Sequence, residues 1–295
     1  MMMTSRTRPF KVIRCTAPGV TAIIAQTGHS FGRHTHDQYG IGVIHHGAQR
    51  SRSGRGMVEA MAGDTITVNP GEVHDGAPLG DGARHWRMLY LDPVVVVDAL
   101  GDIGGGGAQV MEFSRPVITA PATAARASRL FDLMTAPAAR AAPLARDEAL
   151  LDLLADAIAD RAAADTAIPA AIARARALID DDPAAPTTLA DLARVSGLSR
   201  FQVLRGITRA TGLPPHAYLI QRRLHLARRL IAGGMALADA AATAGFADQS
   251  HMTRLFRRCH GLSPSDLARA RSCQRSQAEY AGNRARPVAS ITAPT

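Results

Sequence analysis

The chain has 295 residues, of which 46% are hydrophobic and 20% charged, a composition ordinary for a globular protein with room for two domains. The chain has no apolar run of about 18 residues, so the sequence predicts no membrane-spanning helix. No apolar stretch follows the basic residues of the first ten positions, so we expect no secretory signal. Three widely spaced cysteines, Cys15, Cys259 and Cys273, argue against a disulfide framework and for the cytoplasm.

Positive charge is concentrated in the second half of the chain. Residues 1–170 carry 16 Lys and Arg against 17 Asp and Glu, whereas residues 171–295 carry 18 Arg against 8 Asp and Glu. This asymmetry indicates that only the second half meets a polyanion such as nucleic acid. The alternative is a basic surface that is simply solvated.

Residues 20–92 have the pattern of β-strands. Short β-branched stretches, such as 21–24, 41–44 and 65–68, are separated by turns rich in Gly, Ser and Asp. This spacing predicts a small antiparallel barrel or sandwich. We place this domain at residues 1–115, with a flexible loop at 104–107.

Residues 116–168 are predicted to form a helical dimerisation or linker region, which ends in a hinge at 165–169. Leu150, Leu151, Leu154 and Ile158 recur at helical spacing and make one apolar stripe. Either this stripe packs on the barrel, or it pairs with a second copy of the chain.

A short helix, a tight turn and a second helix are predicted between about 188 and 209. The first helix opens with a threonine N-cap at 187–188 and ends at Gly197, because glycine suits the left-handed residue that closes a helix. Ser199 then caps the second helix. Two short helices joined in this way form a helix-turn-helix unit.

The same pattern recurs between about 236 and 258. Gly197 and Gly245 are 48 residues apart, and the glycines that end the two units, Gly212 and Gly261, are 49 apart. Val203 and Met252 then become equivalent inward-facing positions. The alternative, two helical hairpins that serve stability alone, requires this repeat to be accidental.

A helix over 216–231 is predicted to join the two units. Its apolar residues share one face, and at 1.5 Å per residue it is about 24 Å long. This length could hold the two units about one DNA turn apart, near 34 Å, with both second helices on one side of the duplex.

Residues 241–258, followed by Gly261-Leu262-Ser263-Pro264, resemble the signature of the AraC/XylS family of transcription regulators. The resemblance implies an α+β protein with a cupin-like β-barrel and its helical segment first, and an all-α DNA-binding domain with two helix-turn-helix units at 169–272. The last residues, 273–295, are predicted to be a disordered tail. Gly206-Ile207-Thr208 departs from the family pattern, and because glycine costs helix stability we expect the first unit to bind less firmly.

The resemblance also implies which residues contact DNA. Arginine can fork to guanine and glutamine to adenine, and an apolar side chain can meet a thymine methyl group. The base contacts implied are Phe201, Leu204 and Arg205 in the first unit and Gln249, Ser250, His251, Thr253 and Arg254 in the second. Arg222, Arg257 and Arg258 are expected to touch phosphates. For each base contact, a phosphate contact or solvent exposure is the alternative.

In the first domain, His34, His36 and the segment Pro70-Gly71-Glu72-Val73-His74 resemble the two motifs of cupin barrels. Cupin enzymes add a glutamate to three histidines to hold a metal, but here Gly40 and Ile41 stand in its place. Three histidines could still bind zinc or iron, or be structural. Because regulators of this family generally bind a small organic effector here, we predict no metal and no cofactor, with an effector pocket formed by His34, His36, Tyr39, His74 and Trp86.

The function predicted is a ligand-responsive, sequence-specific DNA-binding transcription regulator without catalytic residues. Its candidate partners are double-stranded DNA, a small effector, a second copy of the chain, and RNA polymerase if it activates. The alternatives are a metal-dependent cupin enzyme fused to a DNA-binding domain, and a DNA-binding protein whose barrel only dimerises.

Overall fold

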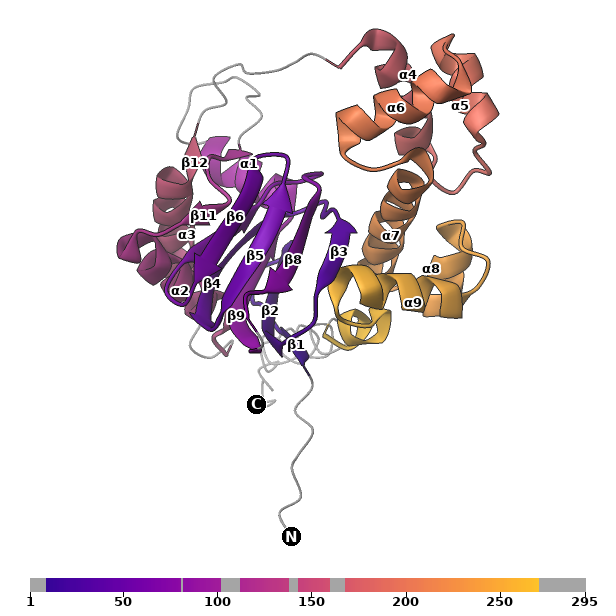
Figure 1. Cartoon of the computed structure of the whole chain (residues 1–295). Helices are drawn as coiled ribbons and strands as arrows, with labels where there is room; N and C mark the ends of the chain where they lie inside the picture. Colours follow the sequence, from indigo (N-terminus) through magenta and orange to yellow (C-terminus); the bar gives the residue numbers. More distant parts are fainter. Residues whose placement is uncertain (1–8, 81, 102–111, 138–142, 160–167, 271–295) are drawn as a thin grey trace, which may run out of the picture.

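The computed structural model describes residues 9–80, 82–101, 112–137, 143–159 and 168–270. It has a sheet-rich N-terminal domain and a helical C-terminal domain (Figure 1), which confirms the predicted α+β class. The expected loop at 104–107, most of the hinge at 165–169 and the tail at 273–295 lie outside the described residues. Within the described part, no helix is long and apolar enough to cross a membrane.

Two antiparallel sheets form the N-terminal domain. The larger has the strand order β1-β2-β9-β4-β7-β11 and the smaller the order β3-β8-β5-β6. The strands of the larger sheet are β1 (Phe10–Ile13), β2 (Val20–Thr27), β4 (Tyr39–His46), β7 (Thr65–Val68), β9 (Arg84–Leu91) and β11 (Val117–Ile118). Those of the smaller are β3 (Phe31–His34), β5 (Ala48–Ser53), β6 (Gly56–Met61) and β8 (His74–Pro78).

The larger sheet has two differently occupied faces because successive side chains of a strand point to opposite sides. On β4, Ile41 and Val43 belong to a core shared with helices, whereas Ile44 belongs to a second apolar cluster with Trp86 and Met88 of β9. This second cluster also holds Ala60 of the smaller sheet, so it lies between the two sheets.

Helices cover the outer face of the larger sheet. They are α1 (Pro93–Gly101), α2 (Pro121–Thr135) and α3 (Pro143–Ala157), and a two-stranded sheet of β10 (Glu112–Phe113) and β12 (Ile158–Ala159) adjoins them. Leu150 and Leu154 of α3 are buried in the core that these helices share with the sheet. Leu150 and Leu154 of the predicted stripe therefore pack on the barrel, which is one of the two alternatives, whereas Ile158 lies in β12 rather than on the helix.

The C-terminal domain contains the helices α4 to α9, and a further helical stretch follows at 264–270. The labelled helices are α4 (Ala170–Asp181), α5 (Leu189–Ser196), α6 (Arg200–Thr211), α7 (Pro215–Gly233), α8 (Leu237–Thr243) and α9 (Gln249–His260). Thr188, Ser199 and Asp248 cap the starts of α5, α6 and α9 with side-chain oxygens. Gly197 and Gly245 have positive φ in the two turns, and Val203 and Met252 are fully buried, as predicted.

The connecting helix α7 is longer than expected. It has 19 residues, and at 1.5 Å per residue it spans about 28 Å. Leu224, Ala227 and Ile231 are buried along one face, where they pack in the core of the second helix-turn-helix unit. The helix α7 is therefore part of a hydrophobic core rather than an exposed linker.

Gly206 has a packing reason that the sequence did not show. A Cβ at this position would lie 2.7 Å from Cγ1 of Ile172 in α4, and closer still to its Cδ1. Residue 206 thus lies close against α4, and a side chain at this position would require Ile172 to move.

Candidate DNA interface and effector cavity

The first recognition helix, α6, exposes the side chains expected to read bases. Phe201 is 64% exposed and Leu204 38%, which is unusual for large apolar residues, and Arg205 is exposed beside them. The Arg205 guanidinium lies 5.6 Å from the centre of the Phe201 ring. These three residues form one surface at the N-terminal half of the helix.

The second recognition helix, α9, has a corresponding exposed surface. Gln249, Ser250 and Arg254 are exposed, while His251 and Thr253 are partly buried. The Asp248 carboxylate accepts a hydrogen bond from the His251 amide at 2.7 Å, and this bond lowers the pKa of Asp248. The cap therefore holds the first turn of the helix in place, since it satisfies an otherwise unpaired N–H group.

The three arginines expected at phosphates differ in their surroundings. Arg257 and Arg258 are exposed on α9. Arg222 on α7 instead lies 2.8 Å from the Asp180 carboxylate in an ion pair between α4 and α7. Its charge is already partly satisfied within the protein.

Both recognition helices end against the barrel at equivalent glycines. A Cβ on Gly212, which ends α6, would lie 3.3 Å from Cβ of Val73. A Cβ on Gly261, which ends α9, would lie 2.5 Å from Cζ of Phe10. The barrel thus contacts the C-terminal ends of both helices and leaves their N-terminal halves open.

A cavity lies between the two sheets and extends to the DNA-binding domain. The space between its walls is about 890 Å³ when the open mouth is included. Its walls include Ile23, Phe31, Trp86 and Met88 from the barrel. Cys259 and His260 at the end of α9 also line it, so the cavity is shared by the two domains.

Four of the five predicted pocket residues line this cavity, namely His34, His36, His74 and Trp86. The prediction for Tyr39 was wrong. Its ring is buried on the opposite face of the larger sheet, in edge contact with Phe113 at 5.7 Å between ring centres. The sequence also missed Arg84 and Tyr90, although β9 alternation from Trp86 places residues 84, 88 and 90 on the same face.

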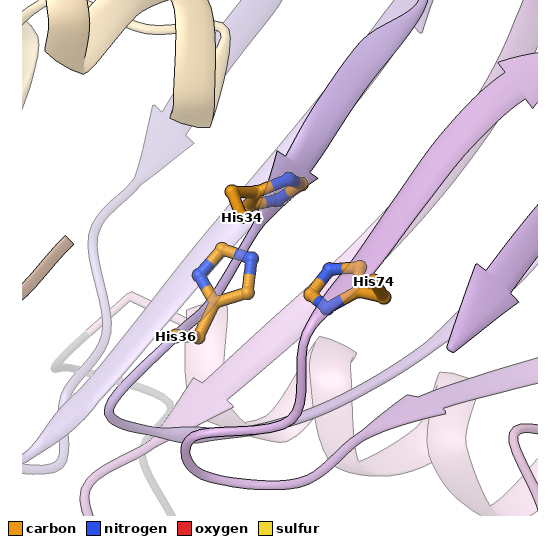
Figure 2. A group of neighbouring side chains, drawn as sticks. All are labelled: His34, His36 and His74. Atoms are coloured by element: carbon orange, nitrogen blue, oxygen red, sulfur yellow. The ribbon is translucent and has the colours of Figure 1, made fainter. Parts of the chain in front are cut away.

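The side chains of the three histidines lie close together (Figure 2), and each offers a ring nitrogen within 4.8 Å of the others. His260 joins them, with its ring centre 5.3 Å from that of His36. Burial lowers the pKa of His34 and His36 well below the ordinary value, and it lowers that of His260 to about 3. The rings are therefore neutral at physiological pH.

Arg84 is a buried cation in an apolar part of the cavity. Its side chain is 1% exposed, and the guanidinium lies 4.9 Å from the Trp86 ring centre. Burial lowers the pKa of Arg84 to about 10, so the group stays charged at neutral pH. One nitrogen donates to the Gly76 carbonyl at 3.3 Å, but Nε and Nη1 are buried without a hydrogen-bond partner among the described residues.

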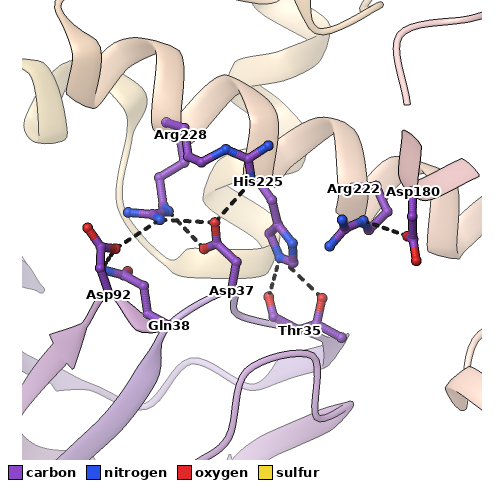
Figure 3. Close-up of polar contacts among 9 residues, drawn as sticks. Thr35, Asp37, Gln38, Asp92, Asp180, Arg222, His225 and Arg228 are labelled. Atoms are coloured by element: carbon purple, nitrogen blue, oxygen red, sulfur yellow. Dashed lines mark hydrogen bonds and ion pairs between the residues drawn. The ribbon is translucent and has the colours of Figure 1, made fainter. Parts of the chain in front are cut away.

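The segment from His34 to Asp37 faces two ways, and it joins the cavity to α7. His34 and His36 point into the cavity, whereas Thr35 and Asp37 contact α7 (Figure 3). The Thr35 carbonyl accepts a hydrogen bond from His225 Nε2 at 3.0 Å.

Asp37 and Arg228 form a two-pronged ion pair across the domain interface. Arg228 Nε and Nη2 each donate to one Asp37 carboxylate oxygen at 3.0 Å. Both side chains are about 15% exposed. Burial alone would raise the pKa of Asp37, but the attraction and hydrogen bonds of Arg228 outweigh it and lower the pKa.

Two protein families match successive parts of the chain. The AraC-like ligand binding domain matches residues 17–154, and a helix-turn-helix domain matches residues 192–270. An uncharacterised helix-turn-helix regulator of Bacillus subtilis, YbfI, is 28% identical over 229 residues, which cover 75% of this chain and 81% of YbfI. The transcriptional activator NphR of a Rhodococcus species is 34% identical over 137 residues, 44% of this chain and 41% of NphR.

The two-domain fold is also found in ToxT from Vibrio cholerae. Its structure with a bound unsaturated fatty acid has a TM-score of 0.54 at 13% identity, over 90% of this chain and 97% of that one. An apo ToxT variant gives a TM-score of 0.56 at 13% identity, over 86% of this chain and 98% of that one. The chain thus carries an AraC-like ligand binding domain followed by a helix-turn-helix domain, and its matching relatives are AraC-type transcription regulators.

Proposed function

We propose that the protein binds a specific DNA sequence through α6 and α9 and that a small molecule in the barrel cavity controls this binding. The observation that carries the proposal is the wall of the cavity. It includes the last two residues of α9, so an occupant touches the sensor domain and a recognition helix at once. An effector that binds one arrangement of the two domains better than another must shift the population toward it.

In this proposal α6 and α9 enter two successive major grooves. The length of α7, about 28 Å, is compatible with a separation of the two helix-turn-helix units near one DNA turn, about 34 Å. Arg205 and Arg254 read guanine edges, and the other exposed residues of the two helices supply the remaining base contacts. Arg257 and Arg258 neutralise phosphates, whereas Arg222 contributes less because Asp180 already pairs with it.

We propose that the effector carries a carboxylate or a similar anionic group. A buried charge is costly unless it is paired, and the Arg84 guanidinium has two nitrogens without hydrogen-bond partners in the described structure. The aromatic and aliphatic wall around it suits an apolar body. That ToxT has been solved with an unsaturated fatty acid is in keeping with such a ligand.

An enzymatic role receives less support. The matching relatives are named as regulators, and cupin enzymes use a carboxylate ligand where this chain has Gly40. A regulator with DNA as its target would work in the cytoplasm.

Selection of bound sequences from random DNA tests the proposal. The purified full chain is mixed with random duplexes, alone and with a panel of apolar carboxylic acids, and the bound fraction is sequenced. We expect one motif with two half-sites and an enrichment that at least one acid changes. Enrichment of no sequence under any condition would refute sequence-specific binding. A motif that no acid alters would refute control by a carboxylate.

A further inference from the structure

The histidine cluster has the donor arrangement of a metal site. The His34 Nδ1 lies 2.7 Å from the Gly32 carbonyl oxygen, and the His74 Nδ1 lies 3.1 Å from that of Glu72. Because a carbonyl oxygen can only accept, each Nδ1 carries the proton and each Nε2 keeps its lone pair. Metal-binding histidines are held in this way, with the second ring nitrogen donating to a backbone carbonyl.

The barrel lacks room for a fourth ligand at the position where cupin enzymes have a carboxylate. A Cβ on Gly40 would lie 2.7 Å from Cε of Met88 and 3.2 Å from Cε1 of Tyr90. Side chains of β9 therefore occupy that space. Three protein ligands and a water already suffice for some metal sites, so a fourth protein ligand, where there is one, comes from another element.

His260 of α9 lies beside the cluster. Its ring centre is 5.3 Å from that of His36 and 6.2 Å from that of His34. Its Nε2 is buried and has no hydrogen-bond partner among the described residues. It is also the last residue of α9, a helix of 12 residues, and the C-terminus of a helix favours a cation.

A nearby carboxylate complements a cation at this place. Glu72 lines the same cavity, and its Oε1 is buried without a hydrogen-bond partner in the described structure, while Asn69 donates to its Oε2. A negative charge left in this state is stabilised by a positive ion close by.

We infer that His34, His36, His74 and His260 form a site for a divalent transition-metal ion shared between the barrel and the second recognition helix. Imidazole nitrogens suit Zn²⁺, Ni²⁺ and Fe²⁺. Metal–nitrogen bonds of about 2.1 Å place tetrahedral ligands about 3.4 Å apart, closer than the present 4.8 Å limit for the three barrel histidines. The ion therefore draws the cluster together and fixes the end of α9 to the barrel.

The metal site goes beyond the proposed function, since the binding of an ion here needs neither DNA nor an organic effector. Only its consequence, a fixed position for α9, rests on that function. A binding measurement without DNA therefore separates the two.

Titration of the metal-stripped full chain with Co²⁺, followed by visible absorption, tests the site. We expect saturation at one equivalent and displacement of Co²⁺ by Zn²⁺. His74→Gln should lower Co²⁺ affinity at least about 100-fold, and His260→Gln about 10-fold, with a changed absorption spectrum in the second variant. His45→Gln is the matched control, because His45 is exposed on the same barrel and should leave binding unchanged.

Thermal unfolding in chelator establishes that each variant is folded, and His36→Gln provides a second barrel variant should His74→Gln fail to fold. Absence of saturable Co²⁺ binding to the wild-type chain would overturn the metal site. Unchanged affinity and spectrum in His260→Gln would overturn its sharing between the two domains. In either case the selection of DNA sequences would still stand as a test of the proposed function.

Discussion

Replacing Asp37 with alanine should loosen the contact between the barrel and α7. Asp37 accepts two hydrogen bonds from Arg228 at 3.0 Å and lies 3.4 Å from Arg229 Nη1. Truncation of one partner of a buried ion pair costs about 2–5 kcal/mol. Here the loss should lie near 2 kcal/mol because Arg228 retains Asp92 at 3.4 Å, and this corresponds to an interface that opens about 30 times more often.

Amide hydrogen exchange at Thr35 measures this opening. The Thr35 amide donates to the Gln221 side-chain oxygen at 3.2 Å across the interface, and both residues are buried. The exchange rate of this amide should rise about 30-fold in Asp37→Ala, under conditions in which the rate is proportional to the equilibrium constant for opening of the interface. Glu59→Ala is the control, since Glu59 pairs with Arg50 on an exposed surface of the barrel. Unchanged exchange at Thr35 in Asp37→Ala would refute the role of this ion pair in holding the domains together.

Three further substitutions test separate parts of the account. Arg254→Ala should lower specific DNA binding by about 1–3 kcal/mol and relax one base position, as measured by anisotropy on operator variants; an equal loss on every sequence would instead make Arg254 a phosphate contact. Gly206→Ala should destabilise the protein to denaturant, because overpacking against Ile172 costs about 1–3 kcal/mol while the gain in helix propensity is about 1 kcal/mol. A more stable variant would contradict this packing. Arg84→Leu should leave the ligand-free melting temperature the same or higher, and it should abolish stabilisation by carboxylic acids that stabilise the wild type; retained stabilisation would exclude Arg84 as their partner.

Local signals allowed the helix-turn-helix units to be predicted well. Gly197 and Ser199 act through their own backbone and the next few residues, so the sequence alone predicts the turn between α5 and α6. Trp86 was placed correctly in the cavity. Because side chains alternate between the two faces of a strand, Arg84, two residues before Trp86, is expected on the same face once β9 is predicted as a strand.

Features that depend on distant contacts could not be predicted. Tyr39 lies three residues after His36, but the residues between them form a loop. Side-chain alternation cannot be extended across this loop, so the sequence does not show which face of the sheet the Tyr39 ring occupies. From the sequence alone, Gly206 is expected only to lower the stability of its helix, and its packing against Ile172 of α4 is seen only in the structure. His260 belongs to the second recognition helix in sequence, and only the docking of the two domains brings it to the barrel histidines.

The spacing of the two half-sites tests whether α6 and α9 are held in a fixed arrangement on DNA. Once the operator is known, about half a helical turn of DNA, roughly 5 bp, is inserted between its half-sites and the affinity of the full chain is measured. Because α7 packs in the cores of both units, through Leu219 in the first and Leu224 in the second, α6 and α9 cannot follow the rotated half-site. We expect the affinity to fall to that of a single half-site, and an unchanged affinity for the lengthened operator would show that the two helices are not held in a fixed arrangement.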